Sequence, residues 1–79
     1  MKTKYEYIDM EEVEKKAKTS VFAIFSNSSK EHIGTIKWYG PWRQYCFFPV
    51  DDTIWNKGCL TDVIDFINQL MEMRKACSQ

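Results

Sequence analysis

The chain has 79 residues, and its 11 basic and 11 acidic side chains give a net charge of zero at pH 7. This length predicts a single domain spanning residues 1–79. The charge balance excludes an overall field that would draw the protein to nucleic acid or to an anionic membrane. No apolar run is long enough to span a membrane, and no signal peptide is visible. Three cysteines without a CxxC motif argue against a disulfide framework, so we expect a reduced, cytoplasmic protein.

The first predicted element is a short helix that follows an extended lead-in at residues 1–8. Asp9 can cap its N-terminus, and Glu12 completes a capping box. Acidic residues then precede lysines by four positions as far as Lys18, an order that supports a helix. The apolar stripe of this helix is thin, so we expect it to pack through a narrow edge.

A meander of three antiparallel strands is predicted to follow. The segment from Thr19 to Phe25 has apolar residues on both faces, which is typical of a strand that is central in its sheet or covered on both faces. A polar turn at residues 26–30 leads into an aromatic hairpin at residues 33–49.

The hairpin is predicted to turn at Gly40-Pro41, because glycine tolerates positive φ and proline fixes its own φ. Tyr39 then faces Trp42. Arg43 faces Trp38 and is expected to form a cation–π contact with its ring. Alternation predicts one face toward the core, with Gly34, Ile36, Trp38, Tyr45 and Phe47, and one outward face, with Ile33, Thr35, Lys37, Tyr39, Trp42, Gln44, Cys46 and Phe48.

A long amphipathic helix is predicted from about Leu60 to Lys75, capped by Cys59 or Thr61. Its apolar stripe consists of Leu60, Val63, Ile64, Ile67, Leu70 and Met71, widened by Phe66. Residues 76–79 are expected to form a frayed tail. The predicted fold is therefore α+β in the order α-β-β-β-α, with both helices on one face of a three-stranded meander.

No reaction chemistry is predicted. A dyad or zinc site built from His32, Cys46 and Cys59 lacks a short ligand pair and an orienting third group. The carboxylates of Asp51, Asp52, Asp62 and Asp65 are best explained as a solvated acidic flank. We therefore expect no catalytic residue, no metal and no cofactor, and a protein that is not an enzyme.

The predicted partner-binding surface is the end of the hairpin and its outward face. It comprises Lys37, Tyr39, Trp42, Arg43 and Gln44, with Trp55 as a flank. Trp, Tyr and Arg dominate interface hot spots, and aromatic rings beside cations also suit stacking on bases. The alternative is that these rings only stabilise the hairpin as cross-strand pairs. The run Lys15-Lys16-Ala17-Lys18 is expected to pair with acids one helical turn earlier rather than to bind nucleic acid.

The predicted order of elements is similar to that of the double-stranded-RNA-binding domain. That family opens its second helix with a basic Lys-Lys-x-Ala-Lys cluster that binds phosphates. This chain instead has Leu60-Thr61-Asp62 at the corresponding place, and its similar run, Lys15 to Lys18, lies in the first predicted helix. The resemblance is therefore one of topology, without the family's motif.

A second resemblance rests on the aromatic run of residues 36–49 together with the segment of residues 59–67. These resemble a group of small, uncharacterised proteins carried by phages and integrated elements of bacteria. The resemblance implies an origin in a phage or an integrated element and a location in the cytoplasm of a bacterial host cell. Small proteins of this kind often act by binding host or defence proteins, anti-CRISPR inhibitors included, so we expect a non-enzymatic interaction protein with such a partner. We expect it to act as a monomer or weak dimer. The alternative is a nucleic-acid-binding module that uses the sheet or the hairpin.

Overall fold

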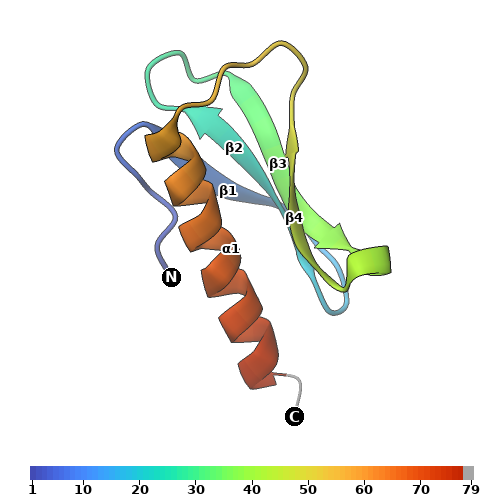
Figure 1. Cartoon of the computed structure of the whole chain (residues 1–79). Coiled ribbons are helices and arrows are strands. Elements are labelled where there is room, and N and C mark those ends of the chain that lie inside the picture. Colours follow the sequence, from blue (N-terminus) through green and yellow to red (C-terminus); the bar gives the residue numbers. More distant parts are fainter. Residues whose placement is uncertain (78–79) are drawn as a thin grey trace.

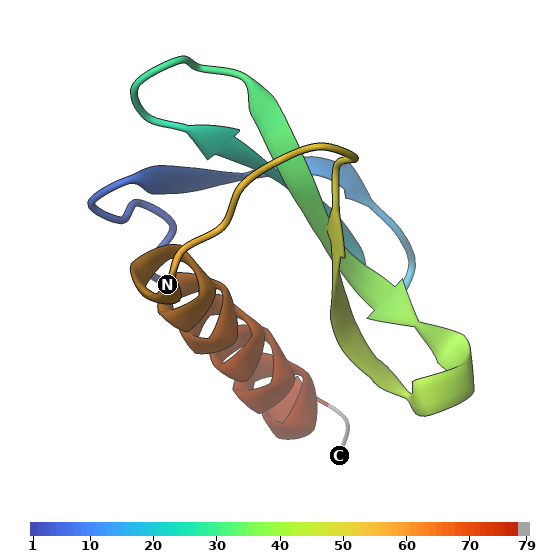
Figure 2. The same cartoon turned by 45° about the horizontal axis from the view of Figure 1, so that its top comes forward.

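The protein is described by a computed structural model covering residues 1–77. Its elements are β1 (Ile8–Lys15), β2 (Ser20–Ser26), β3 (His32–Tyr39), the short 3-10 helix η1 (Gly40–Trp42), β4 (Gln44–Pro49) and α1 (Lys57–Cys77) (Figure 1). The strands form one antiparallel sheet in the order β1-β2-β3-β4. Helix α1 lies along one face of this sheet, and within residues 1–77 no other element covers the opposite face, which we call the open face (Figure 2).

The predicted N-terminal helix is wrong, because this segment forms the edge strand β1. Ile8 and Met10 are two residues apart and both point into the core, where they are 1 % and 5 % exposed. As a strand paired with β2, the segment buries Ile8 and Met10 in the core, which a helix with a thin apolar stripe would do less well. The register shifts between Glu12 and Glu14, so Val13 lies at a bulge and is exposed.

Four strands and one helix replace the predicted three strands and two helices. The chain therefore lacks the α-β-β-β-α topology on which the resemblance to the double-stranded-RNA-binding domain rested. The prediction of a central strand is confirmed, because β2 lies between β1 and β3.

The core lies between α1 and the sheet. Its centre is formed by Ile24, Ile36 and Phe66, which have no exposed surface, and the Phe66 ring meets Phe22 edge-on at 4.9 Å between centroids. A Cβ atom at Gly34 would lie only 2.8 Å from Cε1 of Phe47. The absence of a side chain at Gly34 therefore allows this close packing.

The hairpin register differs from the prediction by two residues. Tyr39 pairs with Gln44, and Trp38 pairs with Tyr45. The turn is longer than expected because Arg43 adopts the left-handed conformation (φ 52°) and donates its N–H to the carbonyl oxygen of Gly40 at 3.1 Å. Because the shift is by an even number of residues, the strand residues other than Ile33 keep their predicted faces. Ile33 is the exception, because a bulge between β2 and β3 lets it pack against the core.

Helix α1 begins earlier than predicted. Asn56, rather than Cys59 or Thr61, caps it, because its Oδ1 accepts the N–H of Cys59 at 2.8 Å. The core face is centred near Phe66, and two residues of the predicted stripe, Leu60 and Ile64, are 40 % and 59 % exposed. The helix continues to Cys77, so only residues 78 and 79 of the predicted frayed tail lie beyond it, outside the described residues.

Candidate binding surface

The sheet topology brings two turns to the same end of the molecule. Consecutive antiparallel strands place the β1–β2 turn and the β3–β4 turn at one end, roughly 10 Å apart given the usual strand spacing. The Ser20 N–H donates to the hydroxyl oxygen of Tyr45 at 3.2 Å, which ties the start of β2 to β4. Figure 1 shows the β1–β2 turn at the same end of the molecule as η1.

This end carries both exposed cations and exposed aromatic rings. We call Lys16, Lys18, Tyr39, Trp42 and Arg43 the basic–aromatic end, and all five are exposed. The rings of Tyr39 and Trp42 meet edge-on at 5.1 Å, and Trp42 remains 66 % exposed. The structure thus brings together Tyr39, Trp42 and Arg43 of the predicted surface.

The sequence reasoning missed Lys16 and Lys18. It placed them in a helix whose acids would neutralise them, whereas they lie in the β1–β2 turn. The alternation of buried Ile8 and Met10 was the pattern that could have revealed the strand, and with it the turn.

The aromatic surface continues from this end along the open face. The Tyr39 ring lies 6.3 Å from that of Phe48, and the Lys37 Nζ lies 4.8 Å from the centroid of the Phe48 ring. Gln44 is exposed opposite Tyr39. Lys37 and Gln44 therefore adjoin the basic–aromatic end, as predicted from the hairpin faces.

Trp55 is not brought to this surface. It lies on the helix side of the sheet, where its ring meets Phe47 at 4.7 Å and its Nε1 donates to the Oγ1 of Thr53 at 2.8 Å. A ring held in this way on the core side cannot flank a site on the open face.

The predicted cation–π contact is made by a different arginine. Arg74 of α1, not Arg43, lies over the Trp38 ring, with its Cζ 4.0 Å from the centroid. Its Nη1 also donates to the carbonyl oxygen of Lys18 at 3.2 Å. Arg74 therefore fastens the end of α1 to both the β1–β2 turn and the hairpin, and leaves Arg43 exposed.

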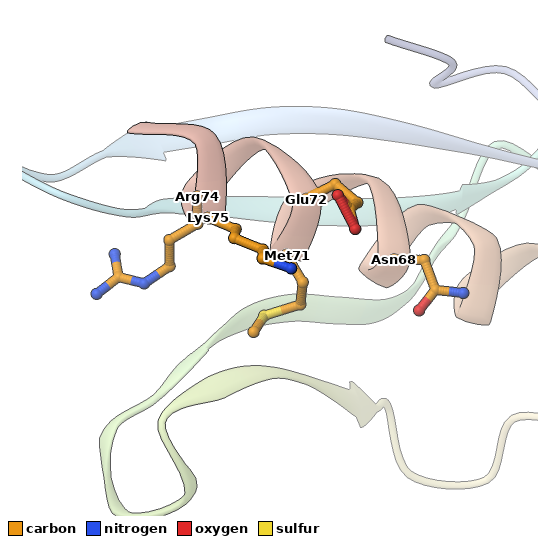
Figure 3. Close-up of a pocket in the computed structure, with 5 residues that line it drawn as sticks. All are labelled: Asn68, Met71, Glu72, Arg74 and Lys75. Carbon is orange, nitrogen blue, oxygen red and sulfur yellow. The ribbon is translucent and has the colours of Figure 1, made fainter. Parts of the chain in front are cut away.

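A shallow hollow lies beside Arg74 on the helix. It is lined by Asn68, Met71, Glu72, Arg74 and Lys75 (Figure 3). In this view Met71 points toward the β3–β4 hairpin, so the hollow is the open flank of the helix–sheet packing.

The opposite end of the molecule carries both acidic and basic side chains, with exposed Lys30 in the β2–β3 turn and exposed Lys57 at the start of α1. Asp51 and Asp52 lie in the β4–α1 loop, which shares a second shallow hollow with the β2–β3 turn. Asp65, predicted to be part of a solvated acidic flank, accepts a hydrogen bond from the Tyr5 hydroxyl at 2.8 Å.

Two tyrosines have perturbed acidities. Burial, the hydrogen bond to Asp65 and the charge of that carboxylate raise the pKa of Tyr5. A hydrogen bond to Glu6 raises the pKa of Tyr7. His32 is exposed, and its Nε2 lies 3.1 Å from the Oγ1 of Thr35. In the part of the chain that is described, no three His, Cys, Asp or Glu side chains gather as a metal site would require.

The helix and the cysteines complete the description of the candidate chemistry. The helix of the described chain is too polar to cross a membrane. Cys46 and Cys59 are free thiols, and the side chain of Cys77 lies outside what is described.

One known protein shows where this chain belongs. Over 58 residues it is 36 % identical to an uncharacterised 9.3 kDa protein of Acholeplasma phage L2, and the match covers 73 % of this chain and 74 % of that protein. The chain belongs to the family of this phage protein. No protein-family model matches the sequence, and no solved structure matches it. The predicted resemblance to small uncharacterised phage proteins is thus confirmed.

Proposed function

We propose that this is a phage- or mobile-element-borne protein without enzymatic activity, whose basic–aromatic end docks on an acidic surface of a host or defence protein. The observation that carries this proposal is the pairing of Trp42, 66 % exposed, with Tyr39 at the end where Lys16 and Lys18 also lie. Exposed aromatic rings beside cations are the composition of interface hot spots. Inhibition of a defence complex is one form that such binding would take in a phage protein.

Charges on the open face favour a protein partner. Glu11 of β1 is exposed on the same face as Lys37 and Tyr39, because the register Glu11–Ala23–Thr35 crosses the sheet on that side. A phosphate backbone that extended across the sheet would meet this carboxylate. A compact acidic patch on a protein would contact only the basic–aromatic end.

Nucleic-acid binding is the second candidate, supported by the row of rings Trp42, Tyr39 and Phe48 with Lys37 above it. Successive bases can stack on such a row while cations contact phosphates. This candidate uses the open face and does not depend on a double-stranded-RNA-binding fold.

The test compares two double variants in a pull-down from host lysate, with and without nuclease. Tyr39→Ala with Trp42→Ala should weaken capture of the partner by roughly 2 kcal/mol, about 30-fold in affinity. Lys16→Glu with Lys18→Glu should weaken it as well, and rising salt should have the same effect on the wild type. All four side chains are exposed, so both variants should remain folded.

Matched controls lie away from this end. Tyr7→Ala removes a ring that is 55 % exposed, and Lys30→Glu with Lys57→Glu reverses two exposed lysines outside the basic–aromatic end. These variants should bind normally. Capture that is lost on nuclease treatment would support nucleic acid instead, and capture unaffected by either end-specific variant would refute the proposed surface.

A further inference from the structure

The two edges of the sheet are protected very differently. Edge strand β1 carries exposed Glu11, Glu12, Glu14 and Lys15 and contains a bulge, which are the features that keep an edge from pairing with another strand. Edge strand β4, Gln44–Pro49, has no charged residue and a regular register with β3. Only β4 therefore presents an edge that is open to pairing.

Backbone geometry identifies the free groups on β4. The Val50 N–H donates to the carbonyl oxygen of Ile33 at 3.0 Å, so residues 44, 46, 48 and 50 direct their backbone groups toward β3. Tyr45 and Phe47 alternate with them, so their N–H and C=O groups point away from the sheet. Pro49 has no N–H and ends this row.

The flank of α1 on the β4 side is also uncovered. The N-terminal segment covers the other flank, where Gln69 bonds to the carbonyl oxygen of Lys2. Figure 3 shows Met71 directed toward the β3–β4 hairpin. Leu60 and Ile64 are spaced by helical turns from Met71, so they lie on the same flank and are 40 % and 59 % exposed.

From these observations we infer that β4 is the interface with a second copy of this chain. The two β4 strands pair antiparallel about a two-fold axis that passes beside Cys46. In this register Tyr45 exchanges hydrogen bonds with the partner's Phe47, and Phe47 with the partner's Tyr45, so every outward N–H finds an acceptor.

A second copy suits this edge because the arrangement is self-complementary. Two uncharged β4 strands have no like charges to bring together, whereas two β1 strands would do so. The sheet continues across the axis, and the partner's Tyr45 and Phe47 extend the apolar layer on the side of the exposed helix flank. Tyr39 and Trp42 lie outside the paired row, so the pairing leaves the basic–aromatic end open.

The register makes a chemical prediction at Cys46. The two Cys46 residues form a non-hydrogen-bonded pair across the axis, with Cα atoms about 4.5 Å apart. A disulfide requires a Cα separation of about 4.4–6.8 Å, so the pair is within bridging distance. Cys59 lies on α1 on the other side of the sheet and has no such counterpart.

The first experiment oxidises single-cysteine variants with diamide, which accepts the two electrons and two protons released when two thiols form a disulfide. The variant that keeps only Cys46 (Cys59→Ser, Cys77→Ser) should form covalent dimers on a non-reducing gel. The variant that keeps only Cys59 (Cys46→Ser, Cys77→Ser) should form no covalent dimer and run as a monomer on the same gel. Equal or slower cross-linking through Cys46 would overturn the register.

The second experiment measures mass by analytical ultracentrifugation over a range of concentrations. The wild type and Cys46→Ser should show the same monomer–dimer equilibrium. Cys46→Lys should be monomeric, because it places two cations opposite each other across the axis, and circular dichroism will show that it is folded. A wild type that stays monomeric throughout, or a dimeric Cys46→Lys, would refute the interface without touching the proposed function.

Discussion

Tyr5 shows how one side chain joins the N-terminal segment, the core and α1. Its ring is 9 % exposed, and its hydroxyl donates to the Oδ2 of Asp65. The Asn27 side chain donates to the carbonyl oxygen of Tyr5, so the backbone is held as well. Burial and the neighbouring carboxylate both disfavour the phenolate and raise the pKa of Tyr5 above its ordinary 10.0.

The raised pKa predicts a loss of stability in alkali. The contribution of Tyr5 is complete below pH 10, where the residue is protonated in both states, and falls as the pH rises toward the folded-state pKa, because the unfolded chain ionises first. Tyr5→Phe removes the hydrogen bond to Asp65 and should lower the free energy of unfolding by about 2 kcal/mol at pH 7. Urea unfolding at pH 7 and above pH 10 should show a smaller alkaline loss for the variant.

Tyr7→Phe is the control, because Tyr7 is 55 % exposed and its bond to Glu6 is screened by water. This variant should unfold like the wild type. If the free energy of unfolding fell equally with rising pH in the wild type and in Tyr5→Phe, the alkaline loss would not come from Tyr5.

At the scale of elements, α1 shows how two neighbouring residues can differ in their role. Val63 is 3 % exposed and belongs to the core, whereas Ile64 is 59 % exposed. Residues that are adjacent in a helix point about a quarter-turn apart, so the orientation of the core face decides which of them is buried.

Aspartate substitutions separate these two residues. Ile64→Asp should stay folded, with a free energy of unfolding within about 0.5 kcal/mol of the wild type, as for other surface positions. Val63→Asp should largely unfold the domain, because it buries an unpaired charge against the sheet. Urea unfolding at low protein concentration measures both, and an unfolded Ile64→Asp would show that the helix is rotated.

At the scale of the whole molecule, stability depends on a small core and on the N-terminal segment that is bonded to β1 and α1. Domains of this size rarely have more than about 5 kcal/mol to lose. The N-terminal segment bonds to β1 through Thr3, whose carbonyl oxygen accepts the Met10 N–H, and to α1 through Lys2 and Tyr5. The predicted extended lead-in is therefore an integral part of the fold.

Removing residues 2–5 should destabilise the domain by about 3–5 kcal/mol, since it deletes a buried ring and leaves Ile8 and Met10 less covered. Thermal unfolding followed by circular dichroism should show a melting temperature far below that of the full chain, or no transition. Lys4→Ala, at an exposed position, should melt like the wild type. An unchanged melting temperature for the truncated chain would mean that the segment is not docked.

The sequence alone determined the central strand, the faces of the hairpin and the existence of the long helix. These depend on local alternation and helical spacing, which assign Ile36 and Tyr45 to one face and Lys37 and Tyr39 to the other whatever the neighbouring strand is. The exposed aromatic part of the candidate site followed from the same alternation.

Only the tertiary structure decided the remaining features, because each depends on a distant part of the chain. Pairing with β2 overrode the helix-capping pattern at Asp9, and the left-handed Arg43 lengthened the turn and moved the register by two residues. The packing of Phe66 against Phe22 oriented α1. Lys16 and Trp42 lie at the same end of the molecule because two turns meet at one end of the sheet, an arrangement that no spacing along the chain encodes.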